Sequence, residues 1–456
     1  MTTSALDTMP SPPLLIGHAR VATLGETPQL LPDGAVLIQE GQVAALGTTA
    51  DLTARYPTAT WWDAGGQLLM PAALCAHTHF YGAFARGMAV PGEPARNFPQ
   101  ILERLWWRLD KALTLEDVRY SALVCLLDAV RHGTTTLIDH HASPHAIPGS
   151  LDVIAKAVQQ AGVRASLCYE VTDRSGPAQM QAGLAENVRF ARALQAQPHP
   201  QLAASFGLHA SLTLSDETLA DCAAAGRELD LGFHIHVAED AADQEDALSK
   251  SGKRVVHRLH EAGILGPKTL AVHCVHVDDS EIAVLAETGT WVTHQPRSNM
   301  NNAVGVAPVE KMLRAGIPVA LGNDGFSNQM GAEIKAAYLV HKLAQRDPRA
   351  MPGDLVLRMA YAHNAQLARI FWPETTLGEI SPGAAADLVL LDYQPTTPLT
   401  TGNLPWHLIF GLEASAITAT ICAGRVLMRD RRLLTLDEEE ITGRSRELAG
   451  LVWRRV

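Results

Sequence analysis

Short apolar runs alternate with longer amphipathic segments between about residues 70 and 375. Brief apolar runs bounded by turn signals are typical of buried strands, and apolar positions at helical spacing predict helices. The predicted strands are residues 69–79, 134–141, 165–170, 204–209, 232–239, 269–276, 291–294 and 319–324. The predicted helices between them include residues 115–132, 152–161, 216–229 and 253–262. Eight such strand–helix units predict an α/β fold built on a (β/α)8 TIM-like barrel.

The two ends of the chain have a different pattern of short strands and turns. The predicted strands are residues 14–24, 35–46 and 60–69 at one end, and residues 386–392, 416–422 and 425–428 at the other. Neither end has enough strands for a stable sheet, so we expect one small composite β-sandwich domain built from both ends. The predicted domains are residues 1–69 (sandwich, first part), 70–377 (catalytic barrel) and 378–456 (sandwich, second part).

A doubly wound open sheet is the rival architecture for the middle of the chain. That architecture gains support from a glycine-rich phosphate-binding fingerprint, and neither G-x-G-x-x-G nor a P-loop occurs in the sequence. The barrel therefore remains the predicted fold.

Polar residues that can bind a metal recur at the carboxyl ends of the predicted strands. His77 and His79 end the first strand, and a second His-x-His pair, His234 and His236, lies in the fifth. Residues two apart on a strand point to the same side, so each pair directs two imidazoles at one point. An isolated pair could equally be two surface histidines. The repetition, with Asp324 after the eighth strand, favours a metal site at the carboxyl face of the barrel.

Each further candidate has a structural alternative. Asp324 could bind a cation or accept a proton, or it could cap a turn or helix. Glu239, three residues after His236, is the candidate acid/base group, or an exposed loop carboxylate. His273 is a further candidate, with a satisfied core histidine as its alternative, and Cys274 beside it is expected to be a packing residue.

Composition narrows the function classes. The chain has 456 residues with a net charge of −11, which disfavours nucleic acid as a partner. No apolar run reaches the ~20 residues that span a bilayer, so no membrane partner is expected, and residues 1–13 do not resemble a secretory leader. The six cysteines include no Cys-x-x-Cys pair, which predicts reduced thiols and a cytoplasmic location. We also expect a homo-oligomer, such as a dimer.

The strand-end motifs together resemble the amidohydrolase superfamily, in its deaminase/chlorohydrolase branch. The motifs are H-T-H at residues 77–79, G-T-T-T at 133–136, H-I-H-V-A-E at 234–239, A-V-H-C-V-H at 271–276, S-N at 298–299 and G-N-D-G at 322–325. The stretches at 105–110, 138–144 and 297–302 are similar to the SsnA-type aminohydrolases. The resemblance covers essentially the whole chain.

This resemblance implies a set of functional residues. One divalent ion, Zn²⁺ or alternatively Fe²⁺, would be held by His77, His79, His236 and Asp324. Glu239 would shuttle a proton to a ring nitrogen of the substrate, and His273 would orient the attacking water. His209 takes the place of the carboxylated lysine of dinuclear relatives, which implies a mononuclear site. The expected substrate contacts are Asp110, His141, His209, Arg297, Ser298 and Asn299.

Several positions keep two interpretations. Arg297 could hold a ring carbonyl or carboxylate, or form an ordinary salt bridge. Trp106 and Trp107 could stack on a planar ring, but they are expected more often to pack a helix. Residues 82–99 are expected to form a loop that covers the site.

The predicted function is metal-dependent hydrolytic deamination of a small N-heterocycle, such as a purine, oxidised purine or pterin, with release of ammonia. Within the same fold, the alternative is removal of a halide or amine from a triazine-like ring, or opening of a cyclic amide. A non-catalytic metal- or ligand-binding relative is disfavoured, because binding alone does not require Glu239 and Asp324.

Overall fold

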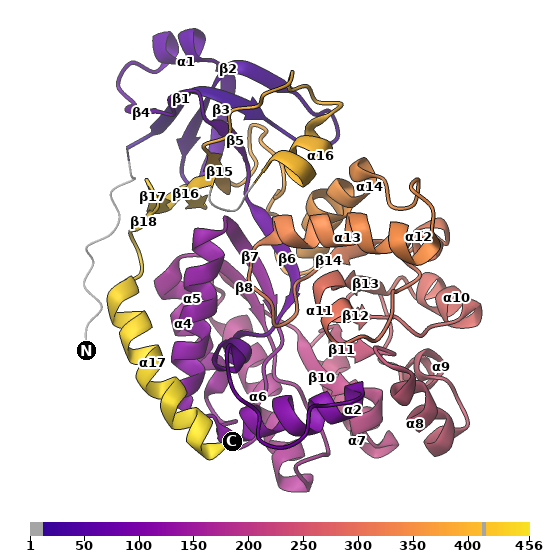
Figure 1. Cartoon of the computed structure of the whole chain (residues 1–456). Helices are drawn as coiled ribbons and strands as arrows, with labels where there is room; N and C mark the ends of the chain where they lie inside the picture. Colours follow the sequence, from indigo (N-terminus) through magenta and orange to yellow (C-terminus); the bar gives the residue numbers. More distant parts are fainter. Residues whose placement is uncertain (1–11, 413–415) are drawn as a thin grey trace.

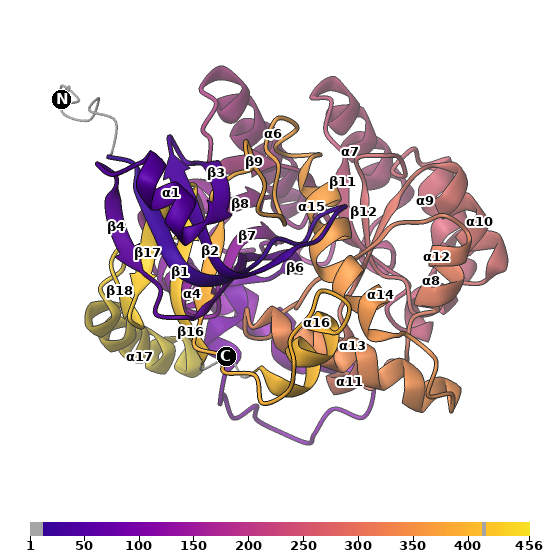
Figure 2. The same cartoon turned by 90° about the horizontal axis from the view of Figure 1, so that it is seen from above.

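A computed structural model describes residues 12–412 and 416–456 of the chain. Parallel strands at its centre are surrounded by helices, and a separate sheet lies beside them (Figures 1 and 2). Residues 1–11, within the segment where no leader is expected, lie outside the described residues. Among the described residues, no helix combines the length and apolar character needed to cross a bilayer.

The central strands form two parallel sheets whose order follows the chain. One contains β6 (Ala73–Thr78), β7 (Thr134–Asp139), β8 (Arg164–Leu167) and β9 (Leu202–Ala204). The other contains β10 (Phe206–Ala210), β11 (Phe233–Val237), β12 (Leu270–His273), β13 (Trp291–His294) and β14 (Val319–Leu321). β9 and β10 flank Ser205, and the predicted fourth strand, residues 204–209, corresponds to β10 and shares only Ala204 with β9.

Contacts at both seams join these two sheets. At one seam, Val171 and Leu208 form a parallel bridge. At the other, Thr78 forms a parallel bridge with Asp324, and the backbone N–H of Asn323 donates to the carbonyl of His77 at 3.0 Å. The predicted parallel α/β architecture is confirmed, and the seams join the strands in the order of a (β/α)8 barrel.

Helices follow most of the central strands. They are α4 (Leu115–Arg131), α5 (Ser150–Ala161), α6 (Pro177–Ala196), α7 (Asp216–Glu228), α8 (Ala241–Ser251), α9 (Val255–Glu261), α10 (Asp279–Glu287), α11 (Pro296–Asn301), α12 (Val309–Arg314), α13 (Met330–Gln345), α14 (Gly353–Arg358) and α15 (Asn364–Ala368). The predicted helices match α4, α5, α7 and α9 to within two residues at each end. A capping box of Thr114 and Asp117 begins α4, because each side chain bonds the other's backbone N–H.

Shorter elements lie over the carboxyl face and near the end of the chain. They are η1 (Phe80–Ala85), α2 (Phe98–Ile101), η2 (Leu102–Trp106), α3 (Trp107–Ala112), η3 (Ser211–Thr213), η4 (Met359–His363), α16 (Leu404–Trp406) and η5 (His407–Gly411). The last helix, α17 (Glu438–Arg455), runs along α4 (Figure 1). Its buried Ile441, Leu448 and Val452 join the same apolar core as the barrel helices.

Strands from both ends of the chain form one nine-stranded sheet. Its members are β1 (Leu14–Ala22), β2 (Leu30–Gln39), β3 (Gln42–Thr48), β4 (Thr60–Asp63), β5 (Leu68–Pro71), β15 (Leu388–Leu391), β16 (Ile417–Cys422), β17 (Arg425–Arg429) and β18 (Arg432–Leu433). The antiparallel pair β5–β15 joins the two ends, and α1 (Thr49–Arg55) follows β3. The composite construction predicted from the sequence is thus confirmed.

Three predicted single strands were wrong, because each contains a turn or break. Residues 35–46 include a hairpin turn between β2 and β3, where Glu40 and Gly41 both have positive φ. Residues 60–69 include the turn at Gly65 and Gly66 between β4 and β5. Residues 69–79 divide at Ala72, whose N–H bonds the carbonyl of Asp387 instead. The domain boundaries at 69/70 and 377/378 stay a prediction, and the first falls inside β5.

Candidate active site

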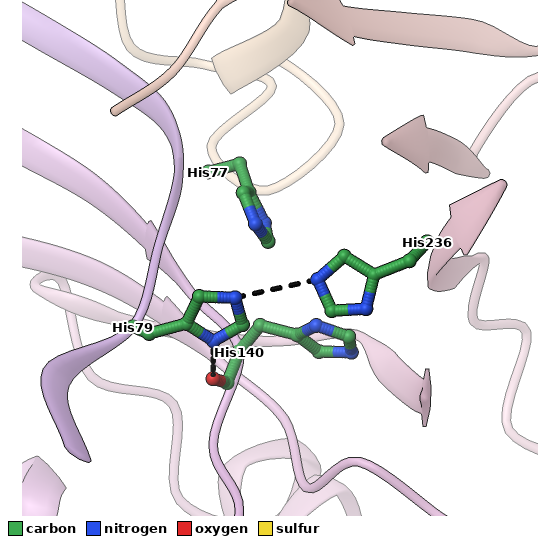
Figure 3. Close-up of side chains that lie close together, drawn as sticks. All are labelled: His77, His79, His140 and His236. Carbon is green, nitrogen blue, oxygen red and sulfur yellow. Dashed lines mark hydrogen bonds between the residues drawn. The ribbon is translucent and has the colours of Figure 1, made fainter. Parts of the chain in front are cut away.

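Three histidines and one aspartate converge at the carboxyl ends of the central strands. His77 lies in β6, His79 directly follows it, His236 lies in β11, and Asp324 follows β14. Asp324 Oδ1 lies 3.0 Å from His79 Nε2 and 3.6 Å from His77 Nε2, and His236 Nε2 lies 3.3 Å from His79 Nε2. Figure 3 shows the three imidazoles turned toward one another. The residues implied as metal ligands are therefore brought together.

Two features of the backbone bring these side chains together: a glycine where two strands approach closely, and positive φ angles at two of the site residues. A Cβ on Gly322 would lie 2.7 Å from the backbone nitrogen of His77, so β14 can approach β6 this closely only with glycine there. Asp324 has φ +58° and His273 has φ +71°, a region that non-glycine residues seldom adopt. Such strain clusters at functional sites and needs support from the surrounding structure.

The ring nitrogens on the far side of each imidazole are already occupied. His79 Nδ1 lies 2.6 Å from the carbonyl of His140, and His236 Nδ1 lies 2.8 Å from that of His209. His77 Nδ1 lies 2.8 Å from His234 Nε2. These contacts fix the ring orientations, as they do for histidines that bind metals.

The donor set fits a divalent metal ion. His77 Nε2 is buried and has no hydrogen-bond partner among the residues that the structure describes. Three imidazoles and one carboxylate are ordinary zinc ligands. Although burial opposes it, hydrogen bonding to Asp324 and Glu170 raises the pKa of His79 well above its ordinary value, which shows that these acids favour positive charge here.

The pKa values of two carboxyl groups in the site are shifted in opposite directions. Burial and the nearby charge of Asp324 raise the pKa of Glu239 well above its ordinary value. Burial would also raise the pKa of Asp324, but the interactions of its carboxylate with His77 and His79 hold that pKa well below its usual range. Two acids pushed in opposite directions are typical of an acid/base pair.

Glu239 and His273 lie beside this cluster. His273 Nε2 lies 3.3 Å from Glu239 Oε2 and 3.8 Å from Asp324 Oδ2. Asn302 donates to the other oxygen of Glu239 at 3.2 Å. Burial lowers the pKa of His273 to about 4, which keeps its imidazole neutral at pH 7.

A cavity of about 540 Å³ opens beside the cluster. Its walls include His79, His236, Glu239 and Asp324, so the converging side chains are reached from the cavity. The wall also includes both predicted ring-stacking candidates, Trp106 and Trp107, together with Asp110, Glu170, His209, Ser298 and Asn302. Part of the wall comes from residues 82–102, in the region where a covering loop is predicted.

Three predicted substrate contacts line this cavity. Asp110 does so while paired with Arg174, and burial raises the pKa of Asp110 to about 6. His209 directs Nδ1 at Thr213 Oγ1, 2.7 Å away. Ser298 also lines the cavity, and its hydroxyl donates to Asp324 Oδ2 at 2.5 Å.

The other three lie outside the cavity wall. Asn299 Nδ2 lies 3.4 Å from His273 Nδ1, which places it behind His273. His141 Nε2 lies 2.9 Å from the hydroxyl of Ser143. Arg297 forms the salt bridge that was its alternative interpretation, with Nε 2.5 Å from a carboxylate oxygen of Glu333.

The sequence reasoning missed a polar layer around the histidine cluster. Glu170 Oε1 lies 3.3 Å from His79 Nδ1 and 3.5 Å from His140 Nδ1. The rings of His140 and His234 stack with centroids 4.3 Å apart. The available signal was position, because Glu170 ends the predicted third strand as His79 ends the first.

Sequence comparison identifies the family. The chain matches the amidohydrolase family over residues 68–427, and an imidazolonepropionase-like composite domain of bacteria over residues 34–59. It is 34% identical to a 5'-deoxyadenosine deaminase of Methanosarcina mazei over 447 residues, 97% of this chain and 99% of that protein. It is 33% identical to a 5-methylthioadenosine/S-adenosylhomocysteine deaminase of Desulforudis audaxviator, covering 90% of this chain and 92% of that protein.

Structural comparison agrees. An adenosine deaminase from Xanthomonas campestris, solved with bound zinc, superposes with a TM-score of 0.85 at 25% identity, covering 97% of this chain and 99% of that one. The chain belongs to the amidohydrolase family, as its motifs predicted. It is an enzyme of the hydrolase class that acts on non-peptide carbon–nitrogen bonds.

Proposed function

We propose that this chain is a metal-dependent deaminase that replaces an amino group of a purine-type heterocycle with oxygen and releases ammonia. The observation that carries the proposal is the convergence of three imidazole Nε2 atoms and Asp324 beside Glu239, at the wall of one cavity. The relatives described above are named as deaminases of adenosine-type compounds, which supports this reaction.

His77, His79, His236 and Asp324 would hold one divalent ion. Zinc is preferred to iron, because the superposed adenosine deaminase contains zinc. When bound, such an ion lowers the pKa of water from about 15.7 toward about 7 and so supplies hydroxide at neutral pH.

The other steps belong to the protein's side chains. Asp324, held ionised by its histidine contacts, accepts a proton from the attacking water. Glu239, whose pKa burial and the nearby Asp324 raise well above its ordinary value, donates a proton to the ring nitrogen beside the reacting carbon, so negative charge does not accumulate there. His273 lies within reach of both carboxyl groups and orients the water between them. Asp324 then passes the proton that it accepted to the amino group, which leaves as ammonia. The hydroxyl proton returns to Glu239, so the ring keeps a carbonyl beside a protonated nitrogen.

A product analysis tests the reaction. Purified, metal-loaded protein should release ammonia from at least one member of a panel of aminopurines, adenosine-type nucleosides and aminopterins. Release of halide or of a substituted amine from triazines, with no ammonia from the panel, would reject the proposal in favour of the alternative hydrolase. The cytoplasmic location and the homo-oligomeric state stay predictions.

A further inference from the structure

Two polar side chains on one turn of helix connect the two carboxyl groups of the site. Ser298 lies in α11, and Asn302 caps its carboxyl end, with the backbone N–H of Asn302 bonded to the carbonyl of Ser298 at 2.8 Å. Asn302 Nδ2 donates to Glu239 Oε1 at 3.2 Å and to Ser298 Oγ at 3.4 Å. The hydroxyl of Ser298 donates to Asp324 Oδ2 at 2.5 Å. These four side chains therefore form one chain of hydrogen bonds from Glu239 to Asp324.

The contacts of Asn302 define how its amide group is oriented. Nδ2 carries two hydrogens, which is enough for both Glu239 and Ser298, and Oδ1 accepts from Nδ2 of Asn301 at 3.1 Å. Rotation of the amide group by 180° would turn Oδ1 toward the carboxyl group of Glu239 and lose all three contacts. Asn302 therefore presents a donor, and not an acceptor, to Glu239.

The end of α11 does not itself require asparagine at position 302. Glycine and asparagine are favoured just after a helix where the backbone has positive φ. Asn302 has φ −80°, and the residue with positive φ is Ala303, at +54°. The side chain of Asn302 is half-buried in the wall of the cavity. The contact with Glu239, and not the geometry of the helix end, therefore accounts for this side chain.

Arg297 anchors the helix that carries these two side chains. Its Nε lies 2.5 Å from Glu333 Oε1 on α13, and its Nη2 donates to the carbonyl of Ser327 at 2.7 Å. Ser327 lies three residues after Asp324, so Arg297 joins α11 both to α13 and to the segment that carries Asp324. A side chain on an element held in this way has the fixed geometry that a proton transfer needs.

The hydrogen bond from Asn302 distinguishes the two oxygens of Glu239. It occupies Oε1, whereas Oε2 lies 3.3 Å from His273 Nε2 and is left for proton transfer. Glu239 is only 8% exposed, so bulk water contributes little to its orientation. When Glu239 gives up its proton it becomes charged, and the hydrogen bond from Asn302 becomes charge-assisted and stronger. An interaction that strengthens in the transition state raises kcat rather than the affinity for substrate.

We propose that Asn302 is a positioning residue that orients Glu239 for proton transfer and, through Ser298, holds it in register with Asp324. The inference rests on the proposed deaminase function and adds a residue to its machinery. It adds no step to the reaction, because the proton still passes from Glu239 to the ring nitrogen. Asn302 acts through Glu239 and need not touch the substrate.

Asn302→Leu keeps the branched shape of the side chain and removes its donors. The zinc-loaded full chain is assayed for ammonia release with adenine, guanine, adenosine and pterin, and kinetics are measured on the ring that the wild type deaminates fastest. The variant should lose about 10- to 100-fold in kcat, as for a catalytic group misplaced by up to about 1 Å, with KM and zinc content unchanged. A wild-type kcat, or a loss confined to KM or to zinc content, would overturn the proposal.

Two further variants support the comparison. Gln345→Leu is the matched control, because it removes an exposed hydrogen bond of the same kind, from Gln345 Nε2 to Glu310 Oε2 at 2.7 Å, and it should keep the wild-type kcat. Asn302→Asp has the size of asparagine and turns a carboxylate oxygen toward Glu239, so packing cannot explain its effect. It should lose at least as much kcat as Asn302→Leu, and a smaller loss would contradict the need for a donor.

A double variant shows whether Asn302 acts through Glu239. Glu239→Gln already removes the proton that is transferred, so the addition of Asn302→Leu should lower kcat by no more than about twofold further. Two side chains that act as a unit give such non-additive losses. The same loss from Asn302→Leu in both backgrounds would mean that Asn302 acts independently of Glu239, and it would overturn the proposal.

Crystallography separates this inference from the deaminase reaction itself. If none of the four rings releases ammonia, the proposed function fails, but crystal structures of the zinc-loaded wild type and Asn302→Leu still test the positioning. The contact between Asn302 and Glu239 should be present in the wild type, and the carboxyl group of Glu239 should be rotated or displaced by about 1 Å in the variant. A carboxyl group that keeps its place in Asn302→Leu would overturn the inference.

Discussion

Substitution of Gly322 by alanine tests whether close packing of the first and eighth strands assembles the site. The new Cβ would lie 2.7 Å from the backbone nitrogen and 2.8 Å from the carbonyl oxygen of His77. Both contacts are with backbone, so no side-chain rotation can relieve them. Ordinary Cβ contacts begin at 3.4 Å, so the two strands must separate by about 0.7 Å.

Separation of the two strands would move Asp324 relative to His77. The N–H groups of Asn323 and Asp324 donate to the carbonyl of His77 at 3.0 and 3.1 Å, and Asp324 would move with them. Overpacking of this kind costs about 1–3 kcal/mol of stability. A misplacement approaching 1 Å at a catalytic group can cost about 10²-fold in rate. We expect Gly322→Ala to remain folded, to bind zinc at least about tenfold more weakly, and to lose about 10²-fold in kcat.

Chelator competition measures the zinc affinity, ammonia release measures kcat, and urea unfolding measures stability. Gly331→Ala is the matched control, because its added Cβ has no neighbour within 4 Å and lies near the start of α13. This control should keep full activity and gain a few tenths of a kcal/mol from helix propensity, about 1 kcal/mol at most. Wild-type zinc affinity and rate in Gly322→Ala would refute the argument that this contact positions Asp324.

Three further predictions concern individual groups. Glu239→Gln should lower kcat by about 10²–10⁴-fold with zinc content unchanged, and a near-normal rate would remove Glu239 from the proton transfer. Burial lowers the pKa of His236 well below its ordinary value, so the neutral form is favoured on folding. Stability and zinc retention should therefore be full above about pH 6.5 and decline as the pH falls below it. Dialysis at each pH followed by elemental analysis measures the zinc that is retained. Zinc retention that is unchanged down to pH 4 would contradict imidazole ligation. Arg174→Met should lower the free energy of unfolding in urea by about 3–5 kcal/mol, because it leaves Asp110 buried without its partner. The double variant with Asp110→Leu should recover much of that loss. If the single and the double variant are equally stable, the two side chains are not coupled.

The parts of the site that sequence reasoning predicted are those that a local pattern encodes. Residues two apart on a strand share a face, and the ends of parallel strands share an edge, so His77, His79 and His236 could be placed together before any contact was known. Asp324 followed from the same rule at the eighth strand. Their roles needed the family resemblance, because spacing alone does not assign a proton transfer.

The parts that were missed depend on pairings between distant segments. A salt bridge was one interpretation of Arg297, but its partner could not be named, because Glu333 lies 36 residues away and no periodic pattern relates α11 to α13. Glu170 lies beside His79 and His140, and those contacts depend on how β6, β7 and β8 pair with one another. The hairpin at Glu40 and Gly41 was overlooked although it had a local signal, since the polar, glycine-containing residues 39–42 separate two apolar runs.

The central claim is that His77, His79, His236 and Asp324 hold one catalytic divalent ion. The most direct measurement is elemental analysis of the purified protein in parallel with its ammonia release, before chelation, after exhaustive chelation and after zinc is restored. The account predicts about one equivalent of divalent metal per chain, with metal and activity lost and regained together, and no high-affinity binding in His236→Ala. Full activity in metal-free protein, or undiminished metal binding in that variant, would contradict it.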